Sequence, residues 1–166
     1  GWGLAGVFAG MALAILAVLR QRLQALADDD ALAKLRERMA SLEPMLPHDR
    51  EDLGLFYKLS LTAGICEEIL YRGYVIWYLS HWVPIYPAAG LASLVFGFGH
   101  AYQGVRGMIT TGIVGAFFAA GFLLTGSLYA GMIMHALMDA HSGHLMWAAY
   151  DRAPSPAPPE PEETAA

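Results

Sequence analysis

The chain has 166 residues, of which 56% are hydrophobic and 15% charged, with a mean hydropathy of +0.41 and a formal net charge of −5. So few polar residues cannot cover the surface of a soluble protein, and the composition predicts an all-α integral membrane protein. Nothing in the charge pattern favours nucleic acid as a partner, and the single cysteine, Cys66, excludes an internal disulfide and a cysteine-based metal site.

Five apolar stretches predict a polytopic transmembrane helix bundle with about five spans. They are Gly1 to Leu19, Leu55 to Leu79, Pro87 to Gln103, Gly107 to Leu124 and Ser127 to Tyr150. The first is uncharged and lacks the basic leader of a cleavable signal peptide. The last two are expected to form a tight helical hairpin, because one helix over residues 107–138 would reach about 48 Å and exceed a hydrocarbon core of about 30 Å. The break is expected at Thr125-Gly126-Ser127.

These spans divide the chain into four parts. The parts are a first transmembrane span (1–19), a cytoplasmic linker with an amphipathic helix (20–54), a four-span core (55–150) and a disordered, proline-rich tail (151–166). In the linker, Ala31 to Leu42 follows the pattern of an amphipathic helix. Its apolar side holds Leu32, Leu35, Met39 and Leu42, and its water-facing side holds Lys34, Arg36, Glu37 and Arg38. The pattern fits a helix on the membrane surface and a solvated connector helix equally well.

Lysine and arginine lie almost entirely on one side of a five-span topology. That side carries Arg20, Arg22, Lys34, Arg36, Arg38, Arg50, Arg106 and Arg152, with Lys58 at its border. The opposite loops, Ser80 to Tyr86 and Thr125 to Ser127, carry none. The positive-inside rule makes the basic side cytoplasmic, so the 20–54 loop and the C-terminus are predicted to lie in the cytoplasm.

Three charged residues, Glu67, Glu68 and Arg72, interrupt the second span. One carboxylate at the centre of a spanning helix costs at least about 2.5 to 3.5 kcal/mol on insertion scales, so these charges indicate a buried functional site. Glu68 and Arg72 are four residues apart, with the acid first, and are expected to form a structural ion pair. Glu67 has no cation of its own and is the candidate general base, because a desolvated carboxylate is a better proton acceptor.

Two further spans contribute ionisable groups, His100 in the third and His135 with Asp139 in the fifth. His135 and Asp139 are four residues apart and share a helix face. At 1.5 Å per residue from the outer loops, Glu67 and His100 both lie about 20 Å deep. Asp139 lies about 18 Å and His135 about 12 Å deep on the same count. A lone buried histidine is most often a packed core residue, but two histidines near two carboxylates favour a site.

Other small and polar residues have simpler explanations. Gly112, Ala116 and Ala120 in the fourth span follow four-residue spacing, which indicates close helix packing with little functional content. His141 and His144 lie further along the last span, where pore lining or an interface contact is enough to explain them. We keep these two histidines as secondary candidates.

The motifs Glu-Glu-x-x-x-Arg, Phe-x-x-x-His and His-x-x-x-Asp follow one another on successive predicted helices. Together they resemble the motifs of the CPBP family, the CAAX protease and bacteriocin-processing (Abi) intramembrane proteases, over about Leu55 to Tyr150. The resemblance implies a catalytic site of Glu67, His100, His135 and Asp139, with Glu68 and Arg72 as an ion pair beside it. It also implies that the first glutamate activates water. Prenyl-protein-processing members typically carry Asn at the last position, and an ionised Asp cannot donate a hydrogen bond to an oxyanion.

The predicted function is that of an intramembrane endopeptidase, which hydrolyses a peptide bond in a membrane-anchored protein or peptide, including a lipidated one, with glutamate-activated water. Two chemical forms stay open. A catalytic zinc ion would take ligands from among His100, His135, Glu67 and Asp139, whereas a metal-free mechanism needs no further residues. The helix motif His-Glu-x-x-His is absent from the sequence, which favours the metal-free form.

Two other classes of protein share these sequence features. A transporter or proton-relay subunit also uses buried Glu, His and Asp, although the chain has no detectable inverted repeat and offers few spans. A non-catalytic binding or immunity protein of the membrane would use the same motifs only to hold its helices together. All three hypotheses place the chain in a lipid bilayer, and the protease hypothesis adds a membrane-anchored substrate.

Overall fold

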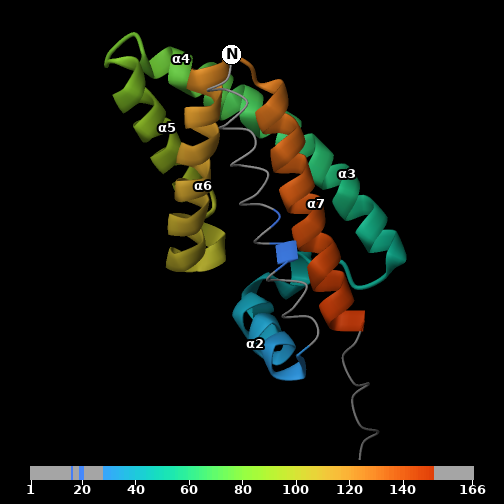
Figure 1. Ribbon diagram of the computed structural model, residues 1–166. Coiled ribbons are helices and arrows are strands. Elements are labelled where there is room, and N and C mark those ends of the chain that lie inside the picture. Colours follow the sequence, from blue (N-terminus) through green and yellow to red (C-terminus); the bar gives the residue numbers. More distant parts are fainter. Residues whose placement is uncertain (1–15, 17–18, 21–27, 152–166) are drawn as a thin grey trace, which may run out of the picture.

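A computed structural model describes residues 16, 19–20 and 28–151, and these residues contain helices and no strand (Figure 1). The predicted all-α class is therefore confirmed for this part of the chain. The predicted first span and the proline-rich tail lie outside the described residues, apart from Leu16, Leu19 and Asp151. The elements are α2 (Asp29–Met39), the 3-10 helix η1 (Ala40–Met45), α3 (Arg50–Glu67), the π-helix η2 (Glu68–Val75), α4 (Ile76–Leu79), α5 (Ile85–Gly99), the 3-10 helix η3 (Ala101–Gln103), α6 (Gly104–Thr125) and α7 (Tyr129–Asp151).

The second predicted span, Leu55 to Leu79, begins earlier than the hydrophobic pattern indicates. The side chain of Asp49 accepts a hydrogen bond from the backbone N–H of Asp52 at 2.8 Å. This contact satisfies one of the free N–H groups of the first turn and starts α3 at Arg50. The helix therefore carries one polar turn before its apolar part.

The same segment changes its winding at the charged motif. From Glu68 onward the helix widens into η2, and the N–H of Ile76 bonds to the carbonyl of Tyr71, five residues earlier. π-Helical turns are rare and occur frequently at functional sites. The predicted continuous α-helix is thus interrupted at the residues to which the sequence assigns the chemistry.

The last three predicted spans are helices whose ends differ from the prediction by a few residues. Pro84 is extended, with a ψ of 153°, and α5 begins directly after it. Gly126 follows α6 in the left-handed conformation, with a φ of +66°, which glycine adopts without steric cost. The chain therefore breaks at the expected Thr125-Gly126-Ser127.

The helices pack as two pairs, α3 with α7 and α5 with α6 (Figure 1). The α6 and α7 helices are joined by a short turn but contact each other little, so the predicted tight hairpin is wrong. Small residues explain the actual pairing, because they let two backbones approach closely. Gly64 of α3 lies against Ala136 of α7, and Gly97 of α5 lies against Gly112 of α6.

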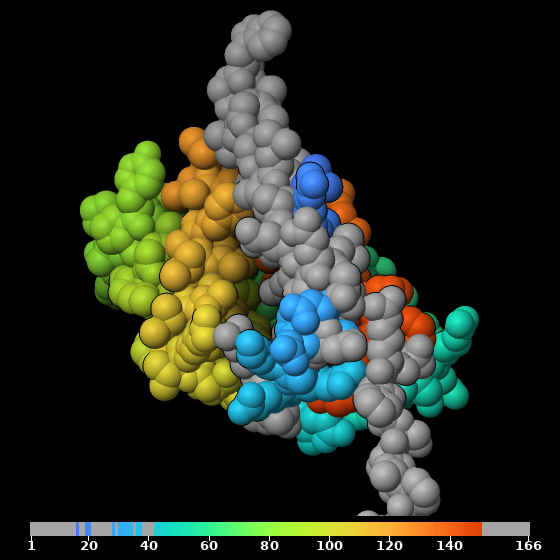
Figure 2. All heavy atoms as spheres, turned by 60° about the horizontal axis from the view of Figure 1, so that its bottom comes forward, coloured from blue at the N-terminus to red at the C-terminus, as the bar shows by residue number. Residues whose placement is uncertain are grey.

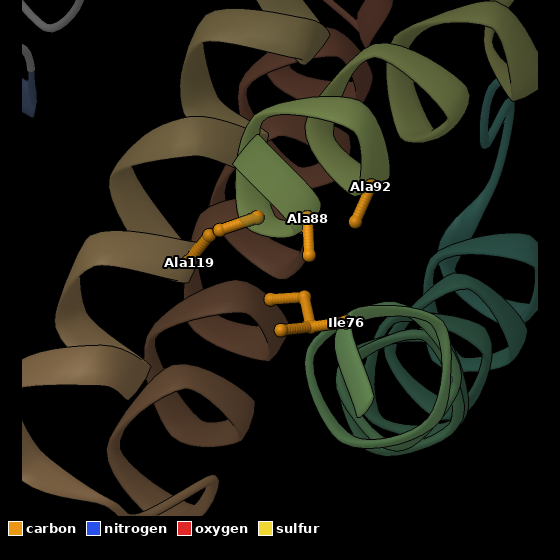
Figure 3. Packing of buried hydrophobic residues seen from close by; sticks show 5 residues of the cluster. Ile76, Ala88, Ala92 and Ala119 are labelled. Atoms are coloured by element: carbon orange, nitrogen blue, oxygen red, sulfur yellow. The ribbon is translucent and has the colours of Figure 1, made fainter. Parts of the chain in front are cut away.

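A small apolar core joins α4 to the α5–α6 pair. Figure 3 shows Ile76 of α4 beside Ala88 and Ala92 of α5 and Ala119 of α6, all of them buried. The short alanine side chains leave room for Ile76 between the helices. This contact fixes the helix that follows η2 and so supports the π-helical turn from its C-terminal side.

Large apolar side chains cover much of the outer surface of the bundle. Leu59, Leu94, Ile113 and Leu137 come from four different helices, and all are exposed. Apolar surface of this extent is typical of a face that meets lipid or another protein. By length and composition, one described helical segment, Ala101–Thr125, could cross a membrane, and α5 is apolar but shorter. The number of five spans stays a prediction.

The linker helix α2 packs on the end of α7. Figure 2 views this end of the molecule and shows α2 and η1 between the α5–α6 turn and the ends of α3 and α7. The Nε atom of Arg36 donates to the carbonyl of Ala149 at 2.9 Å, and its Nη2 atom bonds to the same oxygen. Arg36 therefore satisfies a free carbonyl at the C-terminal end of α7 and does not face water as predicted. Leu32, on the predicted apolar side, is buried.

We expect Gly64→Ala to destabilise the protein by about 1–3 kcal/mol, the usual cost of overpacking. A Cβ atom at Gly64 would lie 2.7 Å from Ala136 N and 2.9 Å from Met132 O, both in the backbone of α7. Gly90→Ala is the matched control, because a Cβ atom there has open space. Thermal unfolding of the detergent-solubilised variants measures the effect, and equal melting temperatures would contradict the close α3–α7 packing.

Candidate active site

The predicted ion pair lies at the centre of the site. Arg72 Nη1 is 2.9 Å from Glu68 Oε1, and both side chains are 2% exposed or less. Arg72 Nη2 also donates to the carbonyl of Gly115 on α6 at 3.1 Å. Gly115 has to lack a side chain, because a Cβ atom there would lie 2.8 Å from the Phe96 ring. The hydrogen bond from Arg72 to Gly115 thereby attaches the charged η2 turn to α6, a helix that has no charged residue in its middle.

His135 of α7 binds to the same carboxylate. Its Nδ1 atom is 3.0 Å from Glu68 Oε1. A carboxylate only accepts hydrogen bonds, so Nδ1 carries the proton and Nε2 is left to act on other groups. Nε2 lies 3.7 Å from Glu67 Oε2 and 3.5 Å from Asp139 Oδ2. The structure therefore brings together four residues of the predicted site around one imidazole ring, on α3, η2 and α7.

The site opens on the side of Glu67 and Asp139. The side chain of Glu67 is 30% exposed and that of Asp139 is 41% exposed, whereas His135 is only 7% exposed. Within the described part of the chain, Glu67 Oε2 is buried and has no hydrogen-bond partner. Two partly accessible acidic side chains thus lie beside a buried imidazole.

His100 is placed differently from the other predicted site residues. It follows the last residue of α5, and its Nδ1 atom donates to the carbonyl of Phe96 at 2.8 Å. The ring of Phe96 lies 4.7 Å from the His100 ring and 6.0 Å from the His135 ring. Among the described residues, no hydrogen bond or ion pair joins His100 to Glu67, His135 or Asp139. His100 therefore lies next to the cluster, against the ring of Phe96, without a direct hydrogen bond to the described cluster residues.

Two phenylalanines form the apolar wall of the site, and sequence reasoning gave them no role of their own. The guanidinium carbon of Arg72 is 4.4 Å from the ring centre of Phe96 and 5.3 Å from that of Phe118. Cation–π contacts of this kind stabilise a desolvated arginine. Phe96 stands inside the Phe-x-x-x-His motif, but Phe118 carries no sequence signal, because an aromatic residue in an apolar span predicts only packing.

The predicted zinc ligands are not assembled in the structure. Glu68 occupies Nδ1 of His135, and His100 lies outside hydrogen-bonding distance of the acids. Over the residues that the structure describes, no three His, Cys, Asp or Glu side chains are arranged to hold a metal ion. This donor set does not fit a catalytic zinc site, which takes three protein ligands. We therefore derive no reaction step through a metal.

The secondary candidate His144 has a surface contact that explains it. Its Nδ1 atom is 2.7 Å from the hydroxyl oxygen of Tyr57 on α3, and both residues are exposed. The two rings are nearly parallel, at 8°. His144 therefore connects α7 to α3, one turn or more away from the cluster around His135.

The structure is a helical bundle with an apolar outer surface, a buried ion pair and a histidine among three carboxylates. This is the class of structure expected of an intramembrane hydrolase. Residues 50–141, more than half of the chain, match the family described as type II CAAX prenyl endopeptidase Rce1-like. The chain belongs to this family, which confirms the resemblance seen in the sequence. Its kind of function is that of a CAAX intramembrane endopeptidase, and it is an integral membrane protein. The comparisons with curated proteins and with solved structures gave no match.

We expect Arg72→Leu to destabilise the protein by about 3–5 kcal/mol, because it leaves the carboxylate of Glu68 buried without its cation. The double variant Glu68→Gln/Arg72→Leu should lose less than Arg72→Leu alone, since no buried charge remains. Arg106→Leu, on the exposed start of α6, is the control and should change the stability by about 0.5 kcal/mol or less. Denaturation in detergent measures these three variants and the single variant Glu68→Gln, and a double variant that loses as much as the sum of its single variants would contradict the pairing.

Proposed function

We propose that this chain is an endopeptidase in which Glu67 activates the water that hydrolyses a peptide bond in a membrane-anchored substrate. The observation that carries this proposal is the placement of Glu67. Its side chain is partly exposed, and its buried Oε2 atom faces Nε2 of His135 and has no hydrogen-bond partner among the described residues. A general base has to reach water and be held in position, and the partial exposure of Glu67 and its contact with His135 support that role. Family membership supports the reaction class.

The proposed reaction begins when Glu67 takes a proton from a water molecule and the hydroxide adds to the substrate carbonyl carbon. His135, with a proton on each ring nitrogen, donates from Nε2 to the oxygen on which negative charge develops. The C–N bond then breaks, and the proton held by Glu67 passes to the leaving amine. One water molecule is consumed, an acid and an amine are formed, and Glu67 returns to its carboxylate form.

The other residues of the site hold His135 and the water in place. Glu68 fixes the ring at Nδ1, and Arg72 balances the charge of Glu68. Asp139, 3.5 Å from Nε2, orients the imidazole and stabilises its positive charge. His100, next to this cluster, is proposed to reach it through the bound water, to which its unbonded Nε2 presents an acceptor because Nδ1 donates to Phe96.

The proposal includes the predicted topology, with five spans and a four-span core over residues 55–150. The linker helix α2, the η3 turn and the C-terminal end of α7 lie at the same end of the bundle (Figure 1). This arrangement supports a common, cytoplasmic side for the basic segments. The substrate would approach through the bilayer, along outer helix faces that carry exposed apolar side chains.

The proposed substrate is a membrane-anchored protein with a prenylated C-terminal CAAX sequence, after the description of the family. A farnesylated peptide that ends in Cys-aliphatic-aliphatic-X, reconstituted with the protein in liposomes, is the appropriate probe. The same peptide without its prenyl group tests the lipid requirement. Equal cleavage of both peptides would contradict the requirement for a prenyl group but would still support the endopeptidase activity.

We expect Glu67→Gln to lower cleavage of the farnesylated peptide by about 10²- to 10⁴-fold, because the amide cannot accept the proton of water. The melting temperature should stay close to that of the parent, since Glu67 is partly exposed and makes no ion pair with a Lys or Arg of the described part of the chain. Glu51→Gln, in the exposed first turn of the same helix, is the matched control and should keep full activity.

Two results would contradict the proposal. If Glu67→Gln and His100→Ala both fold and leave the processing of a full-length substrate in cells unchanged, the cluster is not catalytic and the binding or immunity hypothesis is favoured. If the parent cleaves no peptide but carries protons across liposomes, and Glu67→Ala abolishes that flux, the site is a proton relay.

We expect the purified protein to keep its cleavage activity after treatment with a chelator, because the described His, Asp and Glu side chains do not form a zinc ligand set. Metal content measured by mass spectrometry before and after treatment accompanies the assay. Activity that disappears on chelation and returns with added zinc, in proportion to the bound metal, would establish the zinc form instead.

A further inference from the structure

Phe118 of α6 stacks on the imidazole ring of His135. The two ring centres are 5.4 Å apart, the planes are inclined by 18°, and Phe118 is only 3% exposed. An offset parallel stack is a favourable arrangement of two aromatic rings. The same phenyl ring also lies 5.3 Å from the guanidinium carbon of Arg72. One side chain therefore contacts both of the groups that bind to Glu68.

The stack on Phe118 restrains the plane of the His135 ring, which the hydrogen bond to Glu68 does not fix. The bond from Nδ1 to Glu68 fixes one atom of the ring but leaves the ring free to rotate about that contact. The ring of Phe96, perpendicular to the imidazole at 86° and 6.0 Å, limits the rotation from one side, and the face of Phe118 sets the plane. The direction of Nε2, toward the two accessible carboxylates, therefore depends on Phe118 as much as on Glu68.

The α6 helix is shaped to bring Phe118 to this place. Gly115, three residues earlier on the same face, leaves room for Phe96 and offers its carbonyl to Arg72. Phe117, the next residue along the chain, is 41% exposed and contacts Phe118 only at a tilt of 57°. The chain thus offers two adjacent phenylalanines, of which only one reaches the site.

We infer that Phe118 is a positioning residue of the endopeptidase, which holds the plane of the His135 ring so that Nε2 points at the reacting groups. The inference rests on the proposed function for its effect on cleavage. The contact itself concerns the orientation of one ring and is measurable without any substrate.

The kinetic test compares Phe118→Leu, which removes the ring, with Phe118→Tyr, which keeps it. Phe118→Leu should lower kcat for the farnesylated peptide by about 10- to 100-fold, because small misplacements of a reacting group have effects of this size. KM should change by about twofold or less, since the residue does not touch substrate. Phe118→Tyr should recover most of the activity, and Phe117→Leu, the matched control, should resemble the parent.

The spectroscopic test uses histidine-labelled protein in detergent micelles, with the His135 signals identified by their loss in His135→Gln. The stacked phenyl ring shifts the ring protons of His135 upfield. Phe118→Leu should move these signals downfield, whereas Phe117→Leu should leave them in place. If Phe118→Leu does not fold, Phe118→Met replaces it in both measurements.

The outcomes separate the inference from the function on which it rests. His135 signals that are the same in the parent and in Phe118→Leu overturn the inference, whatever the activity. Equal losses of kcat in Phe118→Tyr and Phe118→Leu also overturn it, because the ring face would then be irrelevant. If the parent shows the shifted signals but cleaves no peptide, the proposed function fails, while the placement of His135 by Phe118 is supported.

Discussion

The described structure depends on one buried carboxylate. A single oxygen of Glu68 lies 2.9 Å from Arg72 and 3.0 Å from His135, in surroundings from which water is excluded. A buried charge is tolerated only when it is paired, and each partner here is carried by a different part of the chain. Arg72 extends the network to the carbonyl of Gly115 on α6, and His135 anchors α7. Because the carboxylate of Glu68 has to be paired, its contacts hold η2, α6 and α7 together.

Glycines beside Glu68 and Arg72 leave the space that these buried side chains occupy. A Cβ atom at Gly131 would lie 2.9 Å from Glu68 Oε2, and one at Gly115 would meet Phe96 at 2.8 Å. The backbone itself thus forms part of the wall, and the aromatic rings of Phe96 and Phe118 close it. Among the described residues of this cluster, Glu67 and Asp139 stay accessible, whereas Glu68, Arg72 and His135 are buried.

The sequence predicted the helical class, the break at Gly126 and the residues that gather around His135, because these follow from local rules. Hydrophobic runs identify helices, glycine identifies a turn, and charges within an apolar run identify a site whose cost has to be offset. The pairing of helices could not be predicted in this way. Two apolar helices joined by a short turn have no local reason to separate, and only the matching of small residues on α3 with α7, and on α5 with α6, decides their partners.

The sequence by itself thus determined which ionisable residues are candidates for the chemistry, since chemical identity and spacing along a helix are local properties. The tertiary structure alone decided how these residues are arranged. It made Glu68 the shared acceptor of Arg72 and His135, left Glu67 Oε2 without a hydrogen-bond partner among the described residues, and placed His100 against the ring of Phe96. It also brought Phe118 onto the imidazole. Such contacts join residues far apart in the chain, and their geometry depends on how closely the helices approach.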